Sequence, residues 1–281
     1  MDRPPLYIVP PQNTHTHTAI LLHGRSGNGP NFASELFSGL TSNEENLPSS
    51  LPSWRWVFPS SRQLYDTSIQ ARRPTWFDAY SLKNIDEEQD LQIDGLRESV
   101  TYILEIIESE IALVNGDPQK IVLGGFSQGN ATSLWTLFSS LGRFSKPLGG
   151  YLGLCGWLPF NTQITKVLDE ANAANKEASL AVSEFILDKL EASHGEHEHQ
   201  VKRVGDKSHL GIPALHIHHE DDMVIAPKLG REAYAILCGV GLNADIRIVG
   251  GLIPPGYDGH WIGEPFGFDE ILQFLSGLIL S

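Results

Sequence analysis

The chain has 281 residues, of which 41% are hydrophobic and 19% charged, a composition typical of a globular protein that buries an apolar core without disulfides or metals. Its formal net charge of −14 excludes nucleic acid as an expected partner, because phosphate binding requires clustered Lys and Arg. The N-terminus lacks an apolar signal segment, and no window reaches the roughly 18 apolar residues of a spanning helix, so we expect a cytoplasmic protein without a transmembrane segment.

Apolar runs that predict strands alternate with amphipathic stretches that predict helices. In chain order we expect strands over 19–24 and 54–61, a helix over 93–111, a strand over 120–126, a helix from Ser127 to about Gly142, a strand over 149–156, a strand over 213–219, a helix over 227–238, a strand over 244–250 and a helix over 268–279. The strand runs are almost continuously apolar, as in strands covered on both faces. The alternation predicts an α/β protein with a mainly parallel central sheet and helices on both faces.

The stretch from 161 to 211 departs from this alternation because it is long and polar. Apolar residues around Val167 and Leu168, and again around Phe185 and Ile186, indicate helices within it, and GEHEHQVKRVGDKSH then indicates a loop. Excursions of this length inside a compact domain are usually functional or disordered. We therefore expect a single domain over 1–281, with 161–211 as an inserted cap-like or flexible segment.

The segment GGFSQGN, residues 124–130, carries the strongest chemical signal. It contains the pattern G-x-S-x-G, with Ser127 between Gly125 and Gly129, and it joins a predicted strand to a predicted helix. This context is typical of a nucleophile elbow, a strained turn that needs small residues two positions before and after the serine. The N-terminus of the following helix stabilises developing negative charge. We therefore predict a nucleophilic Ser127 rather than a Gly-rich turn without chemistry.

A serine nucleophile needs a base that is oriented by a third group, and in this kind of fold the chain order is Ser, then Asp or Glu, then His. His260 lies beyond the last predicted strand and before the final helix, where neighbouring glycines allow its imidazole to reach the serine. The acid is expected in the turn after the strand 213–219, which offers Glu220, Asp221 and Asp222. The residues alone do not decide which of these three is the acid.

The remaining histidines give no metal signal, because their spacing matches no common site and no cysteine accompanies them. We expect neither a metal nor a cofactor. The histidines on or beside the strand 213–219 are expected to be structural, and those of the polar segment are expected to lie in a loop: His216, His218 and His219 in the first group, and His194, His197, His199 and His209 in the second.

Acyl transfer also requires an oxyanion hole, which is normally built from the amide after the nucleophile and one amide of an early strand–helix loop. The amide of Gln128 would supply the first donor. The loop HGRSGNG, residues 23–29, would supply the second through the amide of Arg25. A phosphate-binding role does not fit this loop, since no Lys-Ser or Lys-Thr follows the glycines.

Several blocks together resemble the acyl-protein thioesterase and carboxylesterase family, whose members are also described as lysophospholipases. The blocks follow the family's order and cover nearly the whole chain apart from 161–211: LLHGRSGNG, RRPTWFD, KIVLGGFSQGN, GLCGWLPF and, more loosely, HHEDDMVIAP and GHWIGEP. The resemblance implies the α/β-hydrolase fold and a serine hydrolase that cleaves carboxylic esters or thioesters. The implied substrates include S-acylated proteins and lysophospholipids.

The resemblance also implies site residues. It implies Ser127 as nucleophile, His260 as base and Asp222 as acid, because the family's His-Gly-x-x-Asp pattern aligns its histidine with His218 and its acid with Asp222. It implies Arg25 and Gln128 as the oxyanion amides. Trp157 and Trp76 would line or lie beside the acyl pocket.

Two alternatives remain open at this stage. Arg25 stands where the family usually has an apolar residue, and the polar segment is longer than is usual, which favours a small-molecule carboxylesterase or a lactonase of a biosynthetic pathway. The other alternative is a non-catalytic binding protein on the same fold, since a fold does not determine a function.

Overall fold

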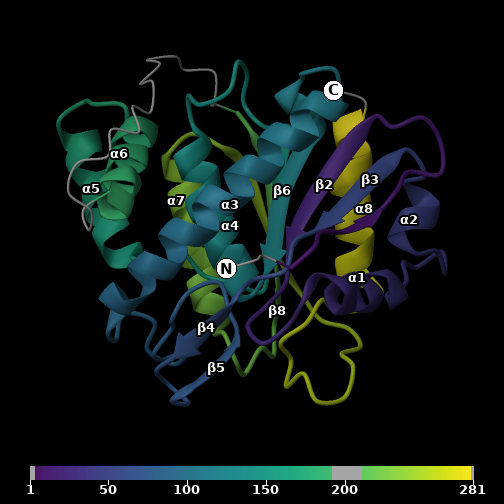
Figure 1. Cartoon of the computed structure of the whole chain (residues 1–281), viewed down its shortest axis with the longest axis horizontal. Coiled ribbons are helices and arrows are strands. Elements are labelled where there is room, and N and C mark those ends of the chain that lie inside the picture. The colour runs from purple at the N-terminus through teal and green to yellow at the C-terminus, as the bar shows by residue number, and fades with distance from the viewer. Residues whose placement is uncertain (1–3, 192–210, 280–281) are drawn as a thin grey trace.

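The computed structural model of the chain describes residues 4–191 and 211–279. A seven-stranded sheet forms the centre of the described residues, with strands in the order β1-β3-β2-β6-β7-β8-β9 (Figure 1). These strands are β1 (Tyr7–Val9), β2 (His17–Leu22), β3 (Trp54–Phe58), β6 (Ile121–Phe126), β7 (Gly150–Leu154), β8 (Pro213–His219) and β9 (Asn243–Val249). β1 runs antiparallel to β3, and every other neighbouring pair is parallel. The mainly parallel sheet predicted from the sequence is therefore confirmed.

Helices cover both faces of this sheet, as predicted. One face packs its apolar residues against α1 (Gly29–Ser38), α2 (Leu47–Ser50) and α8 (Phe266–Ile279). The other face packs against α3 (Gln92–Leu113), α4 (Gln128–Ser140) and α7 (Pro227–Gly239), and α5 (Asn161–Ala173) and α6 (Ala178–Glu191) pack on these helices. Short 3-10 helices over Gln89–Leu91 and Pro118–Lys120 precede α3 and β6. The sheet is thus buried on both sides, which explains why its strands are apolar almost throughout.

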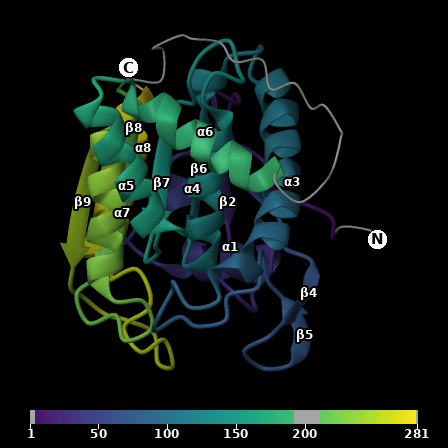
Figure 2. The same ribbon diagram turned by 90° about the vertical axis from the view of Figure 1, so that its left-hand side faces the viewer.

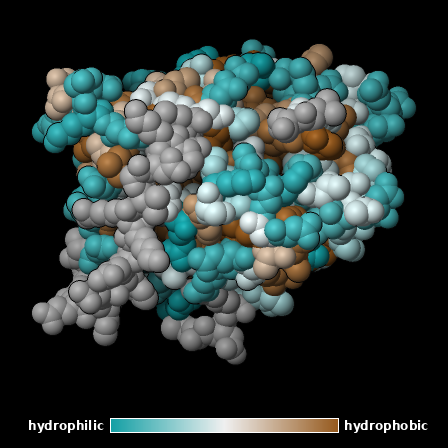
Figure 3. Space-filling model, turned by 90° about the horizontal axis from the view of Figure 1, so that it is seen from above, coloured by the Kyte–Doolittle hydropathy of each residue, from teal (hydrophilic) through white to brown (hydrophobic). Residues whose placement is uncertain are grey.

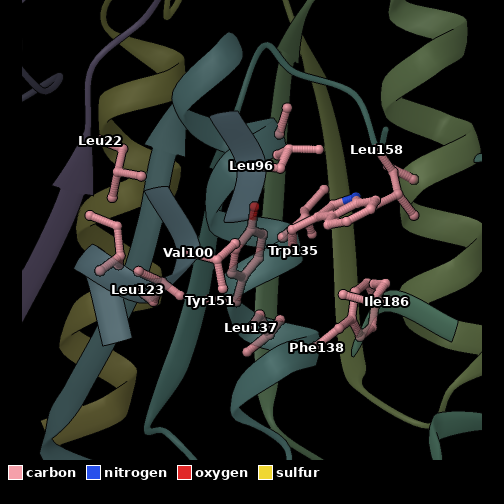
Figure 4. Packing of buried hydrophobic residues seen from close by; sticks show 14 of the residues in the cluster. Leu22, Leu96, Val100, Leu123, Trp135, Leu137, Phe138, Tyr151, Leu158 and Ile186 are labelled. Carbon is pink, nitrogen blue, oxygen red and sulfur yellow. The ribbon is translucent and has the colours of Figure 1, made fainter. Parts of the chain in front are cut away.

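The helix α4, which starts one residue after Ser127, is buried along its whole length. It lies between the sheet and α3, and its large apolar residues join those of the strands and of α6 in one cluster (Figure 4). Its hydroxyl side chains bond back to carbonyls of the helix, as Thr132 does to Gln128 (3.0 Å) and Ser139 to Trp135 (2.8 Å). These bonds satisfy the polar atoms that a buried helix would otherwise leave unpaired.

The predicted segment 161–211 contributes α5 and α6 to the helical layer. Ile164, Val182 and Ile186 are fully buried in the core, and the Ser183 hydroxyl donates to the Phe138 carbonyl of α4 at 2.9 Å. Figure 2 shows these helices alongside α4 and α7. The rest of the segment, from 192 to 210, lies outside the described residues, so the single-domain boundaries and the cap-like role remain predictions.

The predicted strands and helices all occur, with ends displaced by a few residues. The sequence analysis missed β1, α1 and α2, and it missed the hairpin of β4 (Gln63–Asp66) and β5 (Ala71–Pro74). The hairpin strands are largely exposed and carry charged residues, so they show no continuous apolar run. The hairpin follows β3 and lies outside the central sheet.

The carboxyl ends of the parallel strands point to the lower end of the molecule in Figure 1, where the β4–β5 hairpin and the loop over residues 250–265 also lie. Ligands of parallel α/β sheets bind at this end. The opposite end, seen from above in Figure 3, mixes hydrophilic and hydrophobic residues. No helix among the described residues is both long and apolar enough to cross a membrane.

Candidate active site

Ser127 occupies a strained turn between β6 and α4. Its backbone has φ 55° and ψ −119°, a conformation that non-glycine residues rarely adopt. A Cβ atom on Gly125 would lie 2.5 Å from the backbone of Gly129, and one on Gly129 would lie 2.3 Å from the carbonyl oxygen of Leu22 in β2. Glycine is therefore required at both places, and the turn holds the serine at the carboxyl end of the sheet.

Three segments that are far apart in the sequence bring Ser127, His260 and Asp222 into one hydrogen-bonded line. His260 Nε2 lies 2.7 Å from Ser127 Oγ, and His260 Nδ1 lies 2.7 Å from Asp222 Oδ2. All three side chains are buried. Of the acids that the sequence left open, Asp222 makes this contact, whereas Glu220 and Asp221 are exposed.

Both oxygens of Asp222 accept two hydrogen bonds each. Oδ1 accepts from the amides of Val224 (2.9 Å) and Ile225 (2.8 Å), and Oδ2 accepts from His260 Nδ1 and from His218 Nε2 (3.1 Å). Burial raises the pKa of this carboxyl, but the hydrogen bonds from His218, His260 and the Ile225 amide outweigh it and lower the pKa to about 2. Asp222 is therefore ionised at neutral pH.

The two predicted oxyanion donors are both placed at this end of the sheet. Gln128 is the first residue of α4, and Arg25 lies in the turn between β2 and α1. Within residues 4–191 and 211–279, neither amide donates a hydrogen bond to a protein group. Two free backbone donors near a nucleophile are what the stabilisation of an oxyanion requires.

The side chain of Gln128 anchors the segment that follows β5. Its Oε1 accepts from Thr75 Oγ1 at 2.7 Å and from the Trp76 amide at 3.1 Å, and its Nε2 donates to the Phe77 carbonyl at 2.8 Å. All these atoms are buried, so every bond is formed in a medium of low polarity. The bonds fix the start of α4 and hence the position of its first amide.

His23 fixes the other loop, although the sequence analysis assigned no role to its ring. Its Nδ1 donates to the Gly24 carbonyl at 2.6 Å, and its Nε2 accepts from the Ser61 amide at 3.0 Å. Burial lowers the pKa of His23 to about 4, so the ring is neutral at pH 7. The sequence feature that could have indicated this role is the position of His23 directly before Gly24, which opens the loop.

The Arg25 side chain ties the same loop to the β4–β5 hairpin. Its Nη1 donates to the Ala79 carbonyl at 3.3 Å and lies 3.7 Å from Asp66 Oδ2, and Asp66 also forms an ion pair with Arg73. The Ser26 amide bonds the Pro74 carbonyl at 2.8 Å. The hairpin that the sequence analysis missed therefore supports one side of the predicted oxyanion hole.

Trp76 and Trp157, which the resemblance placed at the acyl pocket, are buried with 1% of each residue exposed. The Trp76 indole donates to the His23 carbonyl at 2.7 Å, which links it to the loop that carries Arg25. Trp157 packs edge-on against Phe77 with 6.2 Å between ring centroids. Both support the backbone around the site, and contact with a substrate remains a prediction.

In the part of the chain that the structure describes, no three or more His, Cys, Asp or Glu side chains are grouped so that they could hold a metal ion. His216, His218 and His219 are buried at β8. The four histidines of the polar segment, namely His194, His197, His199 and His209, lie outside the described residues.

Comparison with known proteins identifies the family of the chain. Residues 4–183 match the phospholipase/carboxylesterase family, which covers the β2–α1 loop and Ser127 but not Asp222 or His260. Acyl-protein thioesterase 1 of Cryptococcus neoformans is 29% identical over 58% of this chain, and the match spans 63% of that protein's length. Acyl-protein thioesterase 1 homolog 1 of Dictyostelium discoideum is 26% identical over 96% of this chain and 94% of its own length.

A solved structure shows the same fold. The crystal structure of Zea mays acyl-protein thioesterase 2 superposes over 98% of each chain with a TM-score of 0.63 and 20% sequence identity. The α/β-hydrolase fold expected from the sequence is thereby confirmed. Together with the family match over residues 4–183, these findings establish that the chain belongs to the phospholipase/carboxylesterase family.

Proposed function

We propose that this chain is a serine hydrolase that cleaves carboxylic esters or thioesters, with Ser127 as nucleophile, His260 as base and Asp222 as the group that orients the base. The single observation that supports this most is the line from Asp222 through His260 to Ser127, with 2.7 Å at each of its two contacts. Membership of the phospholipase/carboxylesterase family supports the same conclusion.

In the first step Ser127 Oγ attacks the carbonyl carbon of the substrate while His260 Nε2 removes its proton. The negative charge that develops on the carbonyl oxygen is stabilised by the amides of Gln128 and Arg25, a contribution of about 3 to 4 kcal/mol for one such donor in measured enzymes. Collapse of the tetrahedral intermediate breaks the ester or thioester bond. The leaving alcohol or thiol takes its proton from His260, and the acyl group remains on Ser127.

In the second step a water molecule attacks the acyl carbon, with His260 Nε2 again accepting the proton. Collapse of the second intermediate returns this proton to Ser127 Oγ and releases the carboxylic acid. Asp222 is ionised, so it holds the Nδ1–H tautomer of His260 and stabilises the imidazolium that forms in both steps. His260 Nε2 therefore accepts and returns the proton in both steps.

The relatives suggest the substrate class, because they are named acyl-protein thioesterases. We therefore propose acyl thioesters and esters as substrates, with S-acylated proteins and lysophospholipids as candidates. Hydrolysis of S-palmitoyl peptides, lysophospholipids and short p-nitrophenyl esters should be compared. Turnover restricted to the short esters would instead favour a small-molecule carboxylesterase.

Labelling by a fluorophosphonate probe tests the assignment directly. The wild-type chain should be labelled and should hydrolyse p-nitrophenyl butyrate, and Ser127→Ala should do neither while it keeps its melting temperature. Ser139→Ala is a matched control, since Ser139 is a buried serine on α4 whose hydroxyl donates to the Trp135 carbonyl of the same helix. Unchanged turnover in Ser127→Ala would refute the proposal, and an unlabelled, inactive wild type would favour a non-catalytic binding protein.

A further inference from the structure

His218 makes a contact to the proposed active site that the mechanism above does not use. It lies near the end of β8, is fully buried, and places its Nε2 3.1 Å from Asp222 Oδ2 and 2.8 Å from the carbonyl oxygen of Ile225. Asp222 Oδ2 is the same oxygen that accepts from His260 Nδ1. A second imidazole thus contacts the same oxygen of the carboxylate.

The partners of His218 determine its tautomer. The carbonyl and the carboxylate can only accept hydrogen bonds, so Nε2 carries the proton and shares it between them. The remaining nitrogen, Nδ1, faces His216 Nε2 at 3.5 Å. Burial, with a smaller electrostatic contribution from His218, lowers the pKa of His216 to about 3, so His216 is neutral, and its Nε2 is the nitrogen that faces His218.

The two rings cannot turn away from this arrangement. A Cβ atom on Gly230 of α7 would lie 2.6 Å from His218 Nδ1 and 2.7 Å from His216 Nε2. A Cβ atom on Gly153 of β7 would lie 2.7 Å from His216 Nδ1. Close packing by two glycines from different elements therefore holds both imidazoles in one orientation.

We propose that His218 is a positioning residue for the hydrolytic reaction, whose Nε2–H holds Asp222 Oδ2 in line with His260. The proposal rests on the proposed function. The amides of Val224 and Ile225 hold only Oδ1, so among the described residues His218 is the donor that can keep the oxygen facing His260 in place. If His260 is wrongly oriented, the chemical step slows more than substrate binding weakens.

A purely structural role is the main alternative, because His218 also bonds the Ile225 carbonyl and so closes the turn after β8. Three variants separate the two roles. His218→Leu removes the donor and keeps much of the volume. The amide nitrogen of His218→Gln reaches about as far as Nε2, whereas that of His218→Asn reaches only about as far as Nδ1.

The readouts are kcat and KM for p-nitrophenyl butyrate, the rate of fluorophosphonate labelling, and the melting temperature. His218→Leu and His218→Asn should lower kcat about 10- to 100-fold with KM changed less than about twofold, as expected for the loss of a hydrogen bond to a charged group. His218→Gln should recover most of the rate. His17→Leu, which removes a buried histidine at the start of β2, controls for the general cost of losing a buried imidazole.

Equal kcat in the wild type, His218→Asn and His218→Leu would overturn the inference while leaving the proposed function intact. Loss of rate in His218→Gln equal to that in His218→Asn, with matched melting temperatures, would also overturn it. If His218→Leu does not fold, the comparison of Gln with Asn decides, because both side chains are polar amides. Failure of the proposed function itself would be seen separately, as full activity in Ser127→Ala.

Discussion

The turn after β6 and the turn after β8 place Ser127 and Asp222 at the same edge of the sheet, but different forces hold them. The first turn is set by backbone sterics, since Gly125 and Gly129 leave no room for any side chain. The second is set by hydrogen bonds, since the Asp222 carboxylate accepts four of them, from the backbone, from His218 and from His260. The glycines of the first turn form a recognisable sequence motif, whereas the acid of the second turn is distinguished from its neighbours by its contact with the distant His260.

The largest expected effect is on kcat, when the acid of the second turn is replaced. Asp222→Asn should lower kcat by about 10⁴-fold, because the amide cannot hold His260 in the Nδ1–H tautomer. It should also lower the free energy of unfolding by about 1 to 3 kcal/mol, because the amide nitrogen cannot accept the hydrogen bonds that a carboxylate oxygen accepts. Steady-state kinetics with p-nitrophenyl butyrate measures this loss. Asp221→Asn is the matched control, since Asp221 is exposed and should leave kcat unchanged. A loss below tenfold in Asp222→Asn would show that the carboxylate is not needed to orient the base.

Adding a single methyl group to the first turn should destabilise the fold. The Cβ of Gly129→Ala would lie 2.3 Å from Leu22 O and 2.5 Å from His23 O, and neither backbone atom can move without separating β2 from α4. We expect a loss of about 3 kcal/mol in the free energy of unfolding, measured in urea. Gly277→Ala on α8 has nothing within 4 Å and should gain about 0.5 to 1 kcal/mol. Equal stabilities of the two variants would contradict the steric account.

The loop after β2 is held by the buried, hydrogen-bonded ring of His23, and the dependence of stability on pH tests this contribution. Burial lowers the pKa of His23 from 6.5 to about 4, so below pH 6.5 the unfolded chain binds more protons than the folded one. Stability is fully present above pH 6.5 and should fall by about 3 kcal/mol towards pH 4 on account of this ring. His23→Gln should show a shallower fall in melting temperature over this range. An identical slope in the variant would show that His23 titrates normally.

The smallest expected effect on stability and kcat comes from removing one hydrogen bond to the Gln128 side chain. Thr75→Val keeps the shape of the side chain but removes the hydroxyl that lies 2.7 Å from Gln128 Oε1. We expect a loss of about 1 to 2 kcal/mol in stability, because a buried acceptor loses one of its donors, and a decrease of a few-fold in kcat. Thermal denaturation and steady-state kinetics measure both quantities. A stable variant with unchanged kcat would show that Trp76 and Phe77 alone hold Gln128.

The sequence predicted the sheet and most helices because their residues are buried on known faces, and burial leaves a periodic apolar pattern. β4 and β5 left no such pattern, since their strands are charged and largely exposed. The hairpin was missed for this reason, although Asp66 and Arg73 of the hairpin support the loop that carries Arg25. The local pattern left three adjacent acids open; the resemblance favoured Asp222, which is the one of the three that contacts His260.

The sequence alone determined the α/β class, the strand–turn–helix around Ser127 and the need for glycine on both sides of it, because these follow from the local chain and its apolar periodicity. Tertiary structure alone decided that His260 lies against both Asp222 and Ser127, that His218 contacts the same oxygen of Asp222, and that Trp76 and Trp157 are buried. The physical reason is that hydrogen bonds and close contacts between β6, β8 and the loop before α8 exist only after the sheet has aligned their ends.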